Sequence, residues 1–180
     1  MTEVTSKMTY VERAARVKLM IFDVDGVLTD GSLHYGAEGE ALKTLNVHDG
    51  LGIKLLQEAG VQTAIISART SPQVIKRAAD LGIVHLHQGG HDKLTPFNAL
   101  LEKTGLTAEQ VGFIGDDVVD LPILTRVGFA VAVPNGRAEV LERAHHTTVA
   151  AGGRGAVREV CELLLHAQGT YARVMAQFLV

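Results

Sequence analysis

The sequence predicts an α/β protein in which a mostly parallel sheet lies between two layers of helices, a Rossmann-like three-layer sandwich. Short runs rich in Val, Ile and Phe alternate along the chain with longer stretches of helical periodicity, which is the pattern of successive βαβ units. With 180 residues and 47% hydrophobic content, the chain is long enough to build one core. We therefore expect a single domain over residues 1–180.

Five apolar runs predict the strands. They cover residues 17–22, 61–66, 83–87, 111–114 and 129–133. Helical stretches follow them and are expected at residues 50–59, 72–81, 92–104, 117–126, 135–144 and 157–168. The boundaries are clearest for the second helix, because Ser71 is a favoured N-cap, Pro72 suits the first helical position and Gly82 ends the pattern.

One segment, residues 31–47, interrupts the alternation of strands and helices. Its sequence GSLHYGAEGEALKTLNV has two short strand-like stretches around GAEG, which predicts an inserted β-hairpin. The apolar residues Leu33, Tyr35, Leu42 and Leu45 have no core of their own, and an isolated hairpin is only marginally stable in water. We therefore expect the hairpin to pack against another subunit. A C-terminal tail, residues 169–180, follows the last helix.

The composition excludes several classes of protein. The formal net charge is −3 and the pI is about 6.2, so the chain lacks the basic footprint of a nucleic-acid-binding protein. The single cysteine, Cys161, cannot form an internal disulfide, which fits a reducing compartment. The N-terminal segment lacks the apolar core of a signal peptide, and no apolar run reaches about 18 residues. We expect a cytoplasmic protein that binds neither nucleic acid nor a membrane.

Polar residues follow four of the predicted strands at once. Asp23 and Asp25 come after the first strand, Ser67 after the second, Lys93 after the third and the acidic segment 115–120 after the fourth. In an open parallel sheet, ligands bind outside the carboxyl ends of the strands. Residues i and i+2 of an extended chain face the same side, so Asp23 and Asp25 are expected to face one small volume.

The charge balance of this edge indicates a metal ion. Asp23, Asp25, Asp116 and Asp117 bring four carboxylates together against the one ammonium group of Lys93. Carboxylates this close do not all stay ionised without a cation. Because the ligands are oxygens, with no His or Cys among them, they favour Mg²⁺.

A metal ion with free positions, a hydroxyl and a lysine suit the binding of a phosphate group. Ser67 and Lys93 would then bind the phosphate oxygens. An aspartate beside the phosphate can attack phosphorus and form an aspartyl-phosphate. Asp25 can protonate the leaving alcohol and later accept a proton from the attacking water. The chemistry predicted is therefore hydrolysis of a phosphate ester.

The motifs DVDGVLTDG, IISAR and GDDVVDLP, together with Lys93, resemble the four motifs of the haloacid dehalogenase superfamily of phosphohydrolases, in the same order. More narrowly, NVHDGLGIKLL, HQGGHDKL and AGGRGAVREVCELLL are similar to segments of the family of 3-deoxy-D-manno-octulosonate 8-phosphate phosphatases. This resemblance covers nearly the whole chain. It implies the removal of phosphate from that sugar acid in lipopolysaccharide biosynthesis, in a Gram-negative cytoplasm.

The resemblance also implies roles for matching residues. Asp23 would be the nucleophile and a Mg²⁺ ligand, Asp25 the acid/base whose backbone carbonyl also meets the metal, and Asp116 the remaining protein ligand. Ser67 and Lys93 would complete the catalytic set. The residues expected to bind substrate are Asp25, Asn46, Val47, His48, Asp49, Gly50, Lys54, Arg69, Arg77 and Lys93.

The chain departs from the family pattern at a few positions. His48 and Lys54 stand where arginine is more usual, and Ser67 stands where threonine is common. These departures leave the chemistry unchanged and bear on fine substrate preference. Asp117 and Asp120 could be residues at the start of a helix, where the helix dipole favours a carboxylate, and for Asp120 an orienting role beside the metal ligands is the other interpretation.

The resemblance has implications for assembly as well. The intervals from Asp25 to Ser67 and from Ser67 to Lys93 are too short for a separate cap domain, so the site is expected to be open. A tetramer is implied, in which the hairpins form a central barrel. The Gly/Arg-rich segment AGGRG, residues 151–155, of one subunit would help to cover the site of the next.

Other functions remain open from the residues alone. Within the phosphatases, the substrate could be a related nine-carbon sugar acid phosphate or another small phosphomonoester. A phospho-accepting signalling domain also uses aspartates, Mg²⁺ and lysine at strand ends. Such domains accept phosphate on an aspartate after the third strand, whereas here that strand ends in HLHQGG. A catalytically inactive scaffold is the remaining alternative.

Overall fold

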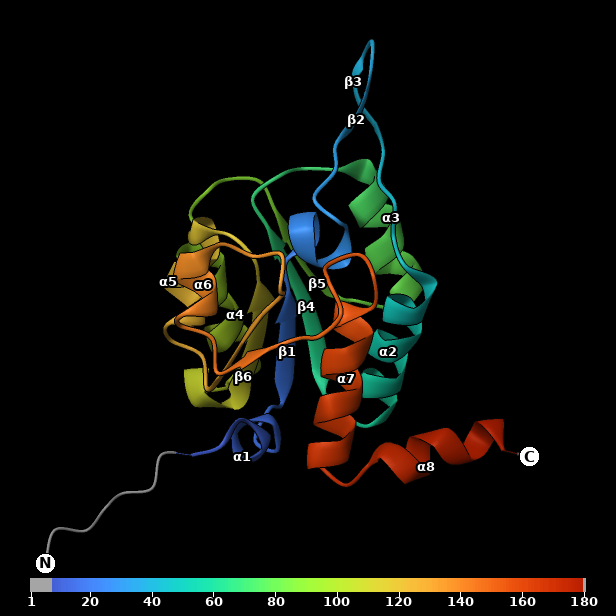
Figure 1. The fold of residues 1–180 in the computed structure, drawn as a ribbon, viewed down its shortest axis with the longest axis vertical. Coiled ribbons are helices and arrows are strands. Elements are labelled where there is room, and N and C mark those ends of the chain that lie inside the picture. Colours follow the sequence, from blue (N-terminus) through green and yellow to red (C-terminus); the bar gives the residue numbers. More distant parts are fainter. Residues whose placement is uncertain (1–7, 180) are drawn as a thin grey trace, which may run out of the picture.

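The computed structural model describes residues 8–179 and has a central six-stranded sheet between two helical layers (Figure 1). The strand order is β5-β4-β1-β6-β7-β8, and all neighbouring strands are parallel. The predicted α/β class and Rossmann-like arrangement are therefore confirmed. The strands are β1 (Leu19–Phe22), β4 (Gln62–Ser67), β5 (His85–Gln88), β6 (Val111–Gly115), β7 (Phe129–Ala132) and β8 (His146–Thr147).

The position of β1 explains why the predicted site residues converge. All four of its residues are buried, and it pairs with β4 on one side and β6 on the other. Phe22 at its end lies level with Ile65 of β4 and Ile114 of β6. The residues that follow these three strands therefore meet at the carboxyl edge of the sheet.

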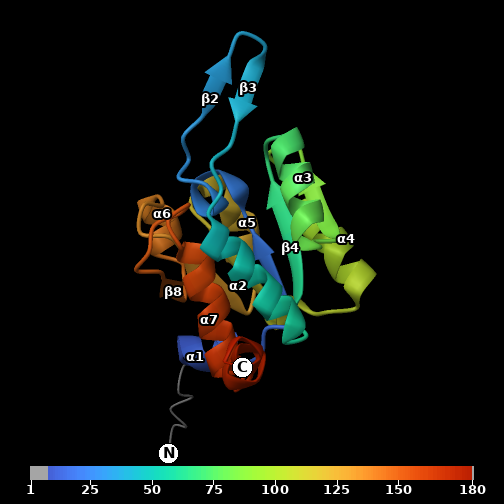
Figure 2. The same cartoon turned by 90° about the vertical axis from the view of Figure 1, so that its right-hand side faces the viewer.

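Two cores cover the two faces of the sheet, because successive residues of a strand point to opposite sides. Met20 and Phe22 of β1 belong to one core, and Leu19 and Ile21 to the other. The first core is completed by α1 (Tyr10–Ala14), α2 (Val47–Glu58), α3 (Pro72–Leu81), α7 (Ala156–Ala167) and α8 (Tyr171–Met175). The second core is completed by α4 (Leu94–Thr104), α5 (Leu121–Leu124) and α6 (Ala138–Leu141) (Figures 1 and 2).

Several helices differ in extent from the sequence prediction. Helix α2 starts three residues earlier than expected, because the Asn46 side chain accepts the His48 N–H at 2.8 Å and caps it. The helix expected at 117–126 divides into a 3-10 turn, η3 (Val118–Asp120), and α5. Helix α6 is much shorter than the predicted 135–144, because the residues before Ala138 form a turn.

The sequence prediction missed the shortest elements. These are α1, β8, α8 and the 3-10 turns η2 (Ala108–Gln110) and η4 (Ala176–Phe178). Each spans at most five residues, which is too short for a helical or strand period to be recognised. The predicted tail is thus helical from Tyr171, and Val174 in it is buried in the first core.

The predicted hairpin is present as β2 (His34–Gly36) and β3 (Gly39–Leu42), which pair antiparallel. It projects from the carboxyl edge of the sheet, beside the end of β1 (Figures 1 and 2). Leu33, Tyr35 and Leu42 are exposed on it. Within residues 8–179 no separate cap domain is inserted, which agrees with the expected open architecture.

No helix in the described part of the chain has the length and apolar character needed to cross a membrane. Residues 1–7 and 180 lie outside the described residues. The predictions that fall there are the start of the N-terminal segment, expected to lack a leader, and the last residue of the tail.

Candidate active site

The turn after β1 carries the two predicted catalytic aspartates, Asp23 and Asp25. Asp23 is extended, with φ −72° and ψ 167°, and the chain then winds through the wide turn η1 (Val24–Leu28). Gly26 has φ +92°, and a Cβ there would lie 2.0 Å from Asp116 Oδ2. Only glycine therefore allows this turn to approach Asp116. Thr29 closes the turn, because its hydroxyl accepts the Gly26 N–H at 3.3 Å.

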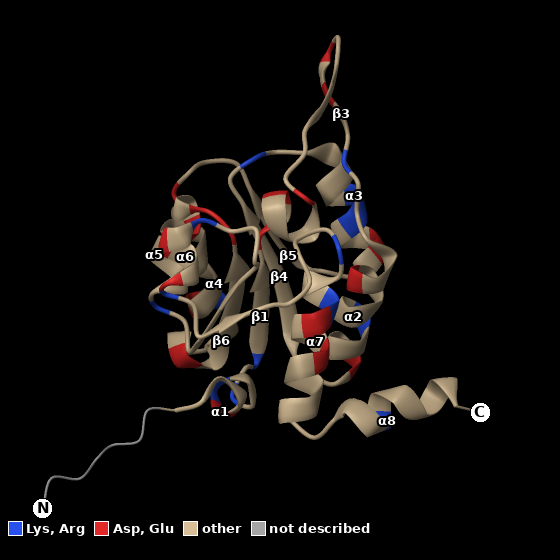
Figure 3. Ribbon diagram, viewed as in Figure 1, with Lys and Arg blue, Asp and Glu red and all other residues tan. Residues whose placement is uncertain are grey.

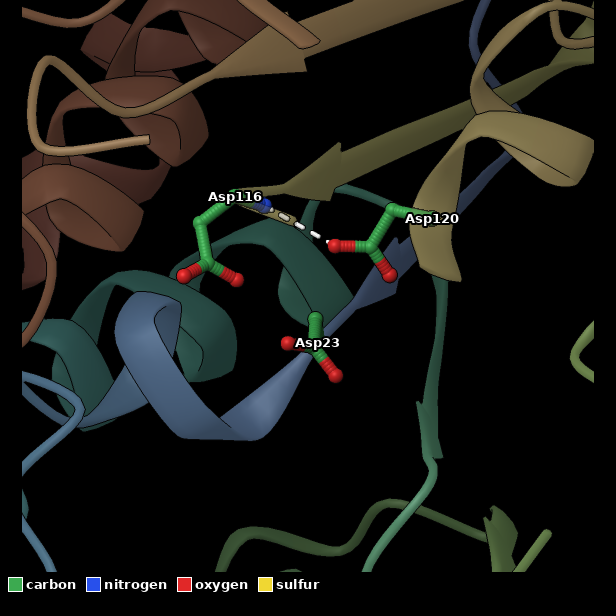
Figure 4. A group of neighbouring side chains, drawn as sticks. All are labelled: Asp23, Asp116 and Asp120. Atoms are coloured by element: carbon green, nitrogen blue, oxygen red, sulfur yellow. Dashed lines mark hydrogen bonds between the residues drawn. The ribbon is translucent and has the colours of Figure 1, made fainter. Parts of the chain in front are cut away.

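Three carboxylates from two strand ends face one small space. Asp23, Asp116 and Asp120 each offer an oxygen within 4.8 Å of the others (Figure 4). Burial and then repulsion from Asp120 raise the pKa of Asp23 well above its ordinary value. Burial, followed by repulsion from Asp120 and Asp117, raises the pKa of Asp116 to about 7. The cluster therefore carries more negative charge than its surroundings neutralise.

Lys93 is the basic residue buried in this cluster. Its Nζ donates to Asp23 Oδ1 at 2.6 Å and to Asp120 Oδ1 at 2.5 Å, and the side chain is 1% exposed. Burial lowers the Lys93 pKa, but the attraction of these two carboxylates outweighs it and raises the pKa overall. Lys93 thus remains an ammonium group at the base of the site.

Asp120 has both of its carboxylate oxygens engaged by the protein. Besides Lys93, it accepts the N–H groups of Asp116 at 2.9 Å and Asp117 at 3.2 Å through Oδ2. It therefore fixes the Asp116 loop and aims Lys93 at Asp23, consistent with the orienting role expected for it. Asp23 and Asp116 remain as the carboxylates of the cluster with oxygens available to a cation.

The donor set fits a magnesium ion. The clustered ligand atoms are carboxylate oxygens, and the raised pKa values of Asp23 and Asp116 indicate that a positive charge would be stabilised there. Hard oxygen donors with room for water and phosphate are what Mg²⁺ prefers. Figure 3 shows acidic residues on η1 and the loops beside it, at the hairpin end of the sheet.

Asp25 does not join this cluster, because its side chain contacts Lys43, the residue that directly follows β3 of the hairpin. The Lys43 ammonium group forms an ion pair with Asp25 and another with Glu40, the latter at 2.6 Å. Arg69 lies 3.2 Å from Glu40 and 3.9 Å from Asp25, and its NH2 donates to the Tyr35 hydroxyl at 3.3 Å. We call these five residues the Asp25 network. Asp25 is thereby held apart from Asp23 although only one residue separates them.

Three members of the Asp25 network were not predicted as site residues. Tyr35 was recognised only as an apolar hairpin residue, and Glu40 and Lys43 were not singled out. In the sequence, nothing distinguishes these three residues from the ordinary polar surface residues of a hairpin. Their partners lie on η1 and after β4, so only the way the hairpin leaves the sheet reveals the contact.

Ser67, predicted to bind phosphate, is the last residue of β4, next to β1, and is 3% exposed. Its backbone oxygen accepts the Gly89 N–H at 3.1 Å, which joins the ends of β4 and β5. The structure thus brings Asp23, Lys93 and Asp116 into one cluster and positions Ser67 on the adjoining strand end.

The residues expected to bind substrate form a second group at the start of α2. Gly50 leaves the space that Arg77 fills, because a Cβ at Gly50 would lie 2.1 Å from Arg77 NH2. The same NH2 is 3.5 Å from the Asn46 carbonyl oxygen. Val47 and His48 are exposed beside them. Lys54 is exposed further along α2, away from the residues at its start, and it is not part of the acidic cluster.

Asp49 has a different environment from the other predicted substrate residues. It is 1% exposed, and its Oδ1 accepts the Arg158 N–H at 2.8 Å near the start of α7. Burial raises its pKa despite this hydrogen bond. Its observed contact is therefore structural, since it ties α2 to the N-terminus of α7, where a carboxylate is favourable.

The segment 151–155 packs against η1 of its own chain. The Gly153 N–H donates to the Val27 carbonyl at 2.8 Å, and a Cβ at Gly152 would lie 1.7 Å from the Gly26 oxygen. Arg154 pairs with Asp30 at 3.3 Å. These contacts lie within one chain, and the expected part of this segment in covering a neighbouring site stays a prediction.

Asn135, predicted only as the first residue of a helix, links these loops. Its side chain donates to the Gly26 oxygen at 3.3 Å and accepts the Gly152 N–H at 2.9 Å. Two residues later, the Arg137 N–H donates to the Asp116 oxygen at 2.7 Å. The sequence could have indicated this role, because the Asn-Gly turn follows β7, the fifth strand whose carboxyl end lies at this edge of the sheet.

This sheet, with aspartates and a lysine at its carboxyl edge, defines a haloacid dehalogenase-like hydrolase, and residues 79–159 match the model of that family. The 3-deoxy-D-manno-octulosonate 8-phosphate phosphatase of Escherichia coli K12 is 47% identical over 159 residues, which are 88% of this chain and 85% of that protein. Its counterpart in Salmonella typhi is 48% identical over 157 residues, 87% and 84% of the two chains. The chain belongs to the family of 3-deoxy-D-manno-octulosonate 8-phosphate phosphatases.

Solved structures agree with this assignment. A probable YrbI-family phosphatase of Pseudomonas syringae superposes with a TM-score of 0.93 at 48% identity, covering 95% of this chain and 97% of that one. The phosphatase of Moraxella catarrhalis, solved with a magnesium ion, a phosphate ion and a KDO molecule, has a TM-score of 0.91 at 42% identity. The coverage is 94% of this chain and 97% of that one. The resemblance seen in the sequence is confirmed.

Proposed function

We propose that this protein is a Mg²⁺-dependent phosphatase that hydrolyses 3-deoxy-D-manno-octulosonate 8-phosphate through an aspartyl-phosphate. The observation that carries the proposal is the buried Asp23 carboxylate, bonded to Lys93 and facing Asp116 at the open edge of the sheet. The family and the magnesium, phosphate and KDO in the Moraxella catarrhalis structure support the choice of metal and substrate.

Asp23 and Asp116 would hold the Mg²⁺ ion, and the backbone carbonyl of Asp25 is the third predicted ligand. When bound, the ion supplies positive charge that offsets both the carboxylates and the phosphate. Lys93 adds a fixed cation next to Asp23, and Ser67 supplies a hydroxyl donor for a phosphate oxygen. With these charges balanced, the Asp23 carboxylate approaches the phosphoryl group without prohibitive repulsion.

The reaction then has two displacements at phosphorus. An Asp23 oxygen forms a bond to phosphorus while the bond from phosphorus to the sugar oxygen breaks, and Asp25 gives its proton to that oxygen. Water next attacks the phosphorus of the aspartyl-phosphate and loses a proton to Asp25. Inorganic phosphate leaves, and Asp23 and Asp25 return to their starting states.

The predicted residues at the start of α2, together with Arg77 and Arg69, would recognise the substrate. Arg69 and Arg77 carry cationic groups suited to the carboxylate of a sugar acid, and Gly50 keeps Arg77 in place. Asn46, Val47 and His48 would contact the sugar from the start of α2. Lys54 and Asp49 remain predictions of the resemblance, and the buried position of Asp49 favours an indirect role.

The same proposal includes the setting in which the enzyme works. We infer a tetramer joined through the exposed hairpins and a role in lipopolysaccharide biosynthesis in the cytoplasm. The exposed apolar residues of the hairpin and the absence of a membrane-spanning helix from residues 8–179 are consistent with this setting.

The proposal is tested by phosphate release from 3-deoxy-D-manno-octulosonate 8-phosphate and a panel of other sugar phosphates, with Mg²⁺ or with EDTA. We expect strong preference for that substrate, loss of turnover in EDTA, and at least a roughly 10³-fold loss of kcat in Asp23→Asn. Asp80→Asn, on the exposed face of α3, is the matched control and should retain full activity.

Each contrary result has a definite meaning. Full activity of Asp23→Asn would refute the aspartyl-phosphate mechanism. Preference for a nine-carbon sugar acid phosphate, or a flat substrate profile, would refute the substrate assignment while leaving the chemistry intact. A stable phosphoprotein without turnover would favour a signalling domain.

A further inference from the structure

The end of the hairpin places the buried ammonium group of Lys43 against Asp25. Lys43 directly follows β3, and its side chain is only 1% exposed although the hairpin itself is exposed. It bonds Asp25 and, at 2.6 Å, Glu40. A lysine loses considerable rotamer freedom when it is ordered, so two charge-assisted bonds are needed to hold it in one position.

Arg69 completes the arrangement from the side of the sheet. Its NH2 lies 3.2 Å from Glu40 Oε2 and 3.3 Å from the Tyr35 hydroxyl, and its Nε lies 3.9 Å from Asp25 Oδ2. Glu40 is therefore held between two cations, and Asp25 faces the same two. The hairpin supplies three of the five members of the Asp25 network.

The Asp25 network determines which way the carboxyl group of Asp25 points. Asp25 follows Asp23 by two residues and precedes Gly26, whose backbone lies against the Asp116 carboxylate, so the backbone that carries Asp25 runs beside the acidic cluster. An acid that turned toward that cluster would not face the leaving oxygen. The Lys43 ammonium group on the opposite side attracts the ionised Asp25 carboxylate away from the cluster, and when Asp25 is protonated it can still donate a hydrogen bond to the Oδ1 atom, which leaves Oδ2 to carry the proton.

We propose that Lys43 is a positioning residue that holds the carboxyl group of Asp25 where it can transfer a proton to the leaving oxygen, with Glu40 anchoring Lys43. The inference rests on the proposed phosphatase function and deepens it. The hairpin, expected only to join subunits, then also contributes to the chemistry of its own chain. Phosphoryl transfer from a leaving group that needs no proton should not depend on Lys43.

The test compares substrates that differ in their need for a proton. Phenyl phosphate and p-nitrophenyl phosphate have similar shapes, but nitrophenolate leaves readily without protonation, whereas phenolate and a sugar alkoxide do not. The kcat/KM value reports the steps up to release of the alcohol. We expect Lys43→Met to lower kcat/KM about tenfold or more for the sugar phosphate and phenyl phosphate, and less than about threefold for p-nitrophenyl phosphate.

The controls separate positioning from damage to the fold. Lys76→Met, on the exposed face of α3, should leave all three values unchanged. Lys43→Arg keeps a cation and should recover part of the loss, and Glu40→Gln should reproduce the pattern of Lys43→Met with smaller factors. An equal loss on all three substrates in Lys43→Met would indicate structural damage and overturn the proposal.

Asp25→Asn distinguishes failure of this inference from failure of the proposed function. The variant removes the acid itself, so it should show the same dependence on the leaving group more strongly, measured from the initial burst where turnover stops at the phosphorylated enzyme. If Asp25→Asn shows the dependence and Lys43→Met does not, only the role of Lys43 is wrong. If Asp25→Asn lacks the dependence, the acid role in the proposed function is wrong as well.

Discussion

At the scale of single residues, Asp116 has the most direct electrostatic consequence. Its pKa is raised to about 7, chiefly by burial and then by repulsion from Asp120 and Asp117. Between the ordinary aspartate value and about 7, the folded protein binds more protons than the unfolded chain. The free energy of unfolding of the metal-free protein therefore falls as the pH rises through this window. The raised pKa of Asp23 acts in the same direction.

We predict that in EDTA the protein melts at a higher temperature at about pH 5 than at about pH 8. Asp116→Asn has no carboxyl group to titrate at this position, so its melting temperature should depend less on pH. Added Mg²⁺ should raise the melting temperature of the wild type most at the higher pH, because ligand binding to the folded state stabilises it. Thermal melts across the pH range check this, and equal slopes for wild type and variant would contradict it.

Among the structural elements, the contact between segment 151–155 and η1 holds the backbone that bears Asp25 in position. Gly152 has no room for a side chain, because its Cβ would lie 1.7 Å from the Gly26 oxygen. The backbone of η1 or of the segment would have to move. Asn135 bonds both partners, so the displacement would reach the turn that bears Asp25.

Gly152→Ala should therefore lower the free energy of unfolding by roughly 1–3 kcal/mol and reduce kcat as well. Gly36→Ala is the matched control, since its nearest neighbour is an ordinary contact at 3.5 Å and its φ is not positive. That control should change stability by less than about 0.5 kcal/mol. Urea unfolding and steady-state kinetics measure both quantities, and wild-type values for Gly152→Ala would refute the bracing role of the segment.

At the scale of the whole molecule, the hairpin is the feature that indicates assembly. Leu33 is 45% exposed, Tyr35 65% and Leu42 48%, on an insertion that projects from the sheet. A two-stranded hairpin has too little core to be stable in water without packing partners. Apolar residues exposed together on such an element are typical of a protein interface.

We predict that the wild type is tetrameric and that Leu33→Lys combined with Leu42→Lys shifts it to smaller species. The buried lysines would repel each other in the interface and lose hydration. Val84→Lys, at a position 79% exposed away from the hairpin, should leave the assembly unchanged. Size-exclusion chromatography with light scattering measures this, and a monomeric wild type at micromolar concentration would contradict the assembly.

The order of strands and helices and the site at the carboxyl edge could be predicted from local patterns. Helix α3 was predicted with both boundaries correct, because Pro72 and Gly82 limit it by backbone geometry alone. Asp23, Lys93 and Asp116 could be predicted together because parallel strands bring their carboxyl ends to one edge. By contrast, α6 was predicted too long, because the turn at Asn135 is held by η1 and segment 151–155, which are remote in sequence.

The fold class, the inserted hairpin, the acidic edge and the family could all be predicted from the sequence, since each depends on residue types at short spacing along the chain. The packing of the whole chain, in contrast, sets which partner each polar side chain takes. It joined Asp120 to Lys93, Asp49 to α7 and Lys43 to Asp25. The physical reason is that electrostatic and hydrogen-bond energies depend on distance and burial, and these arise only when segments far apart in sequence are packed together.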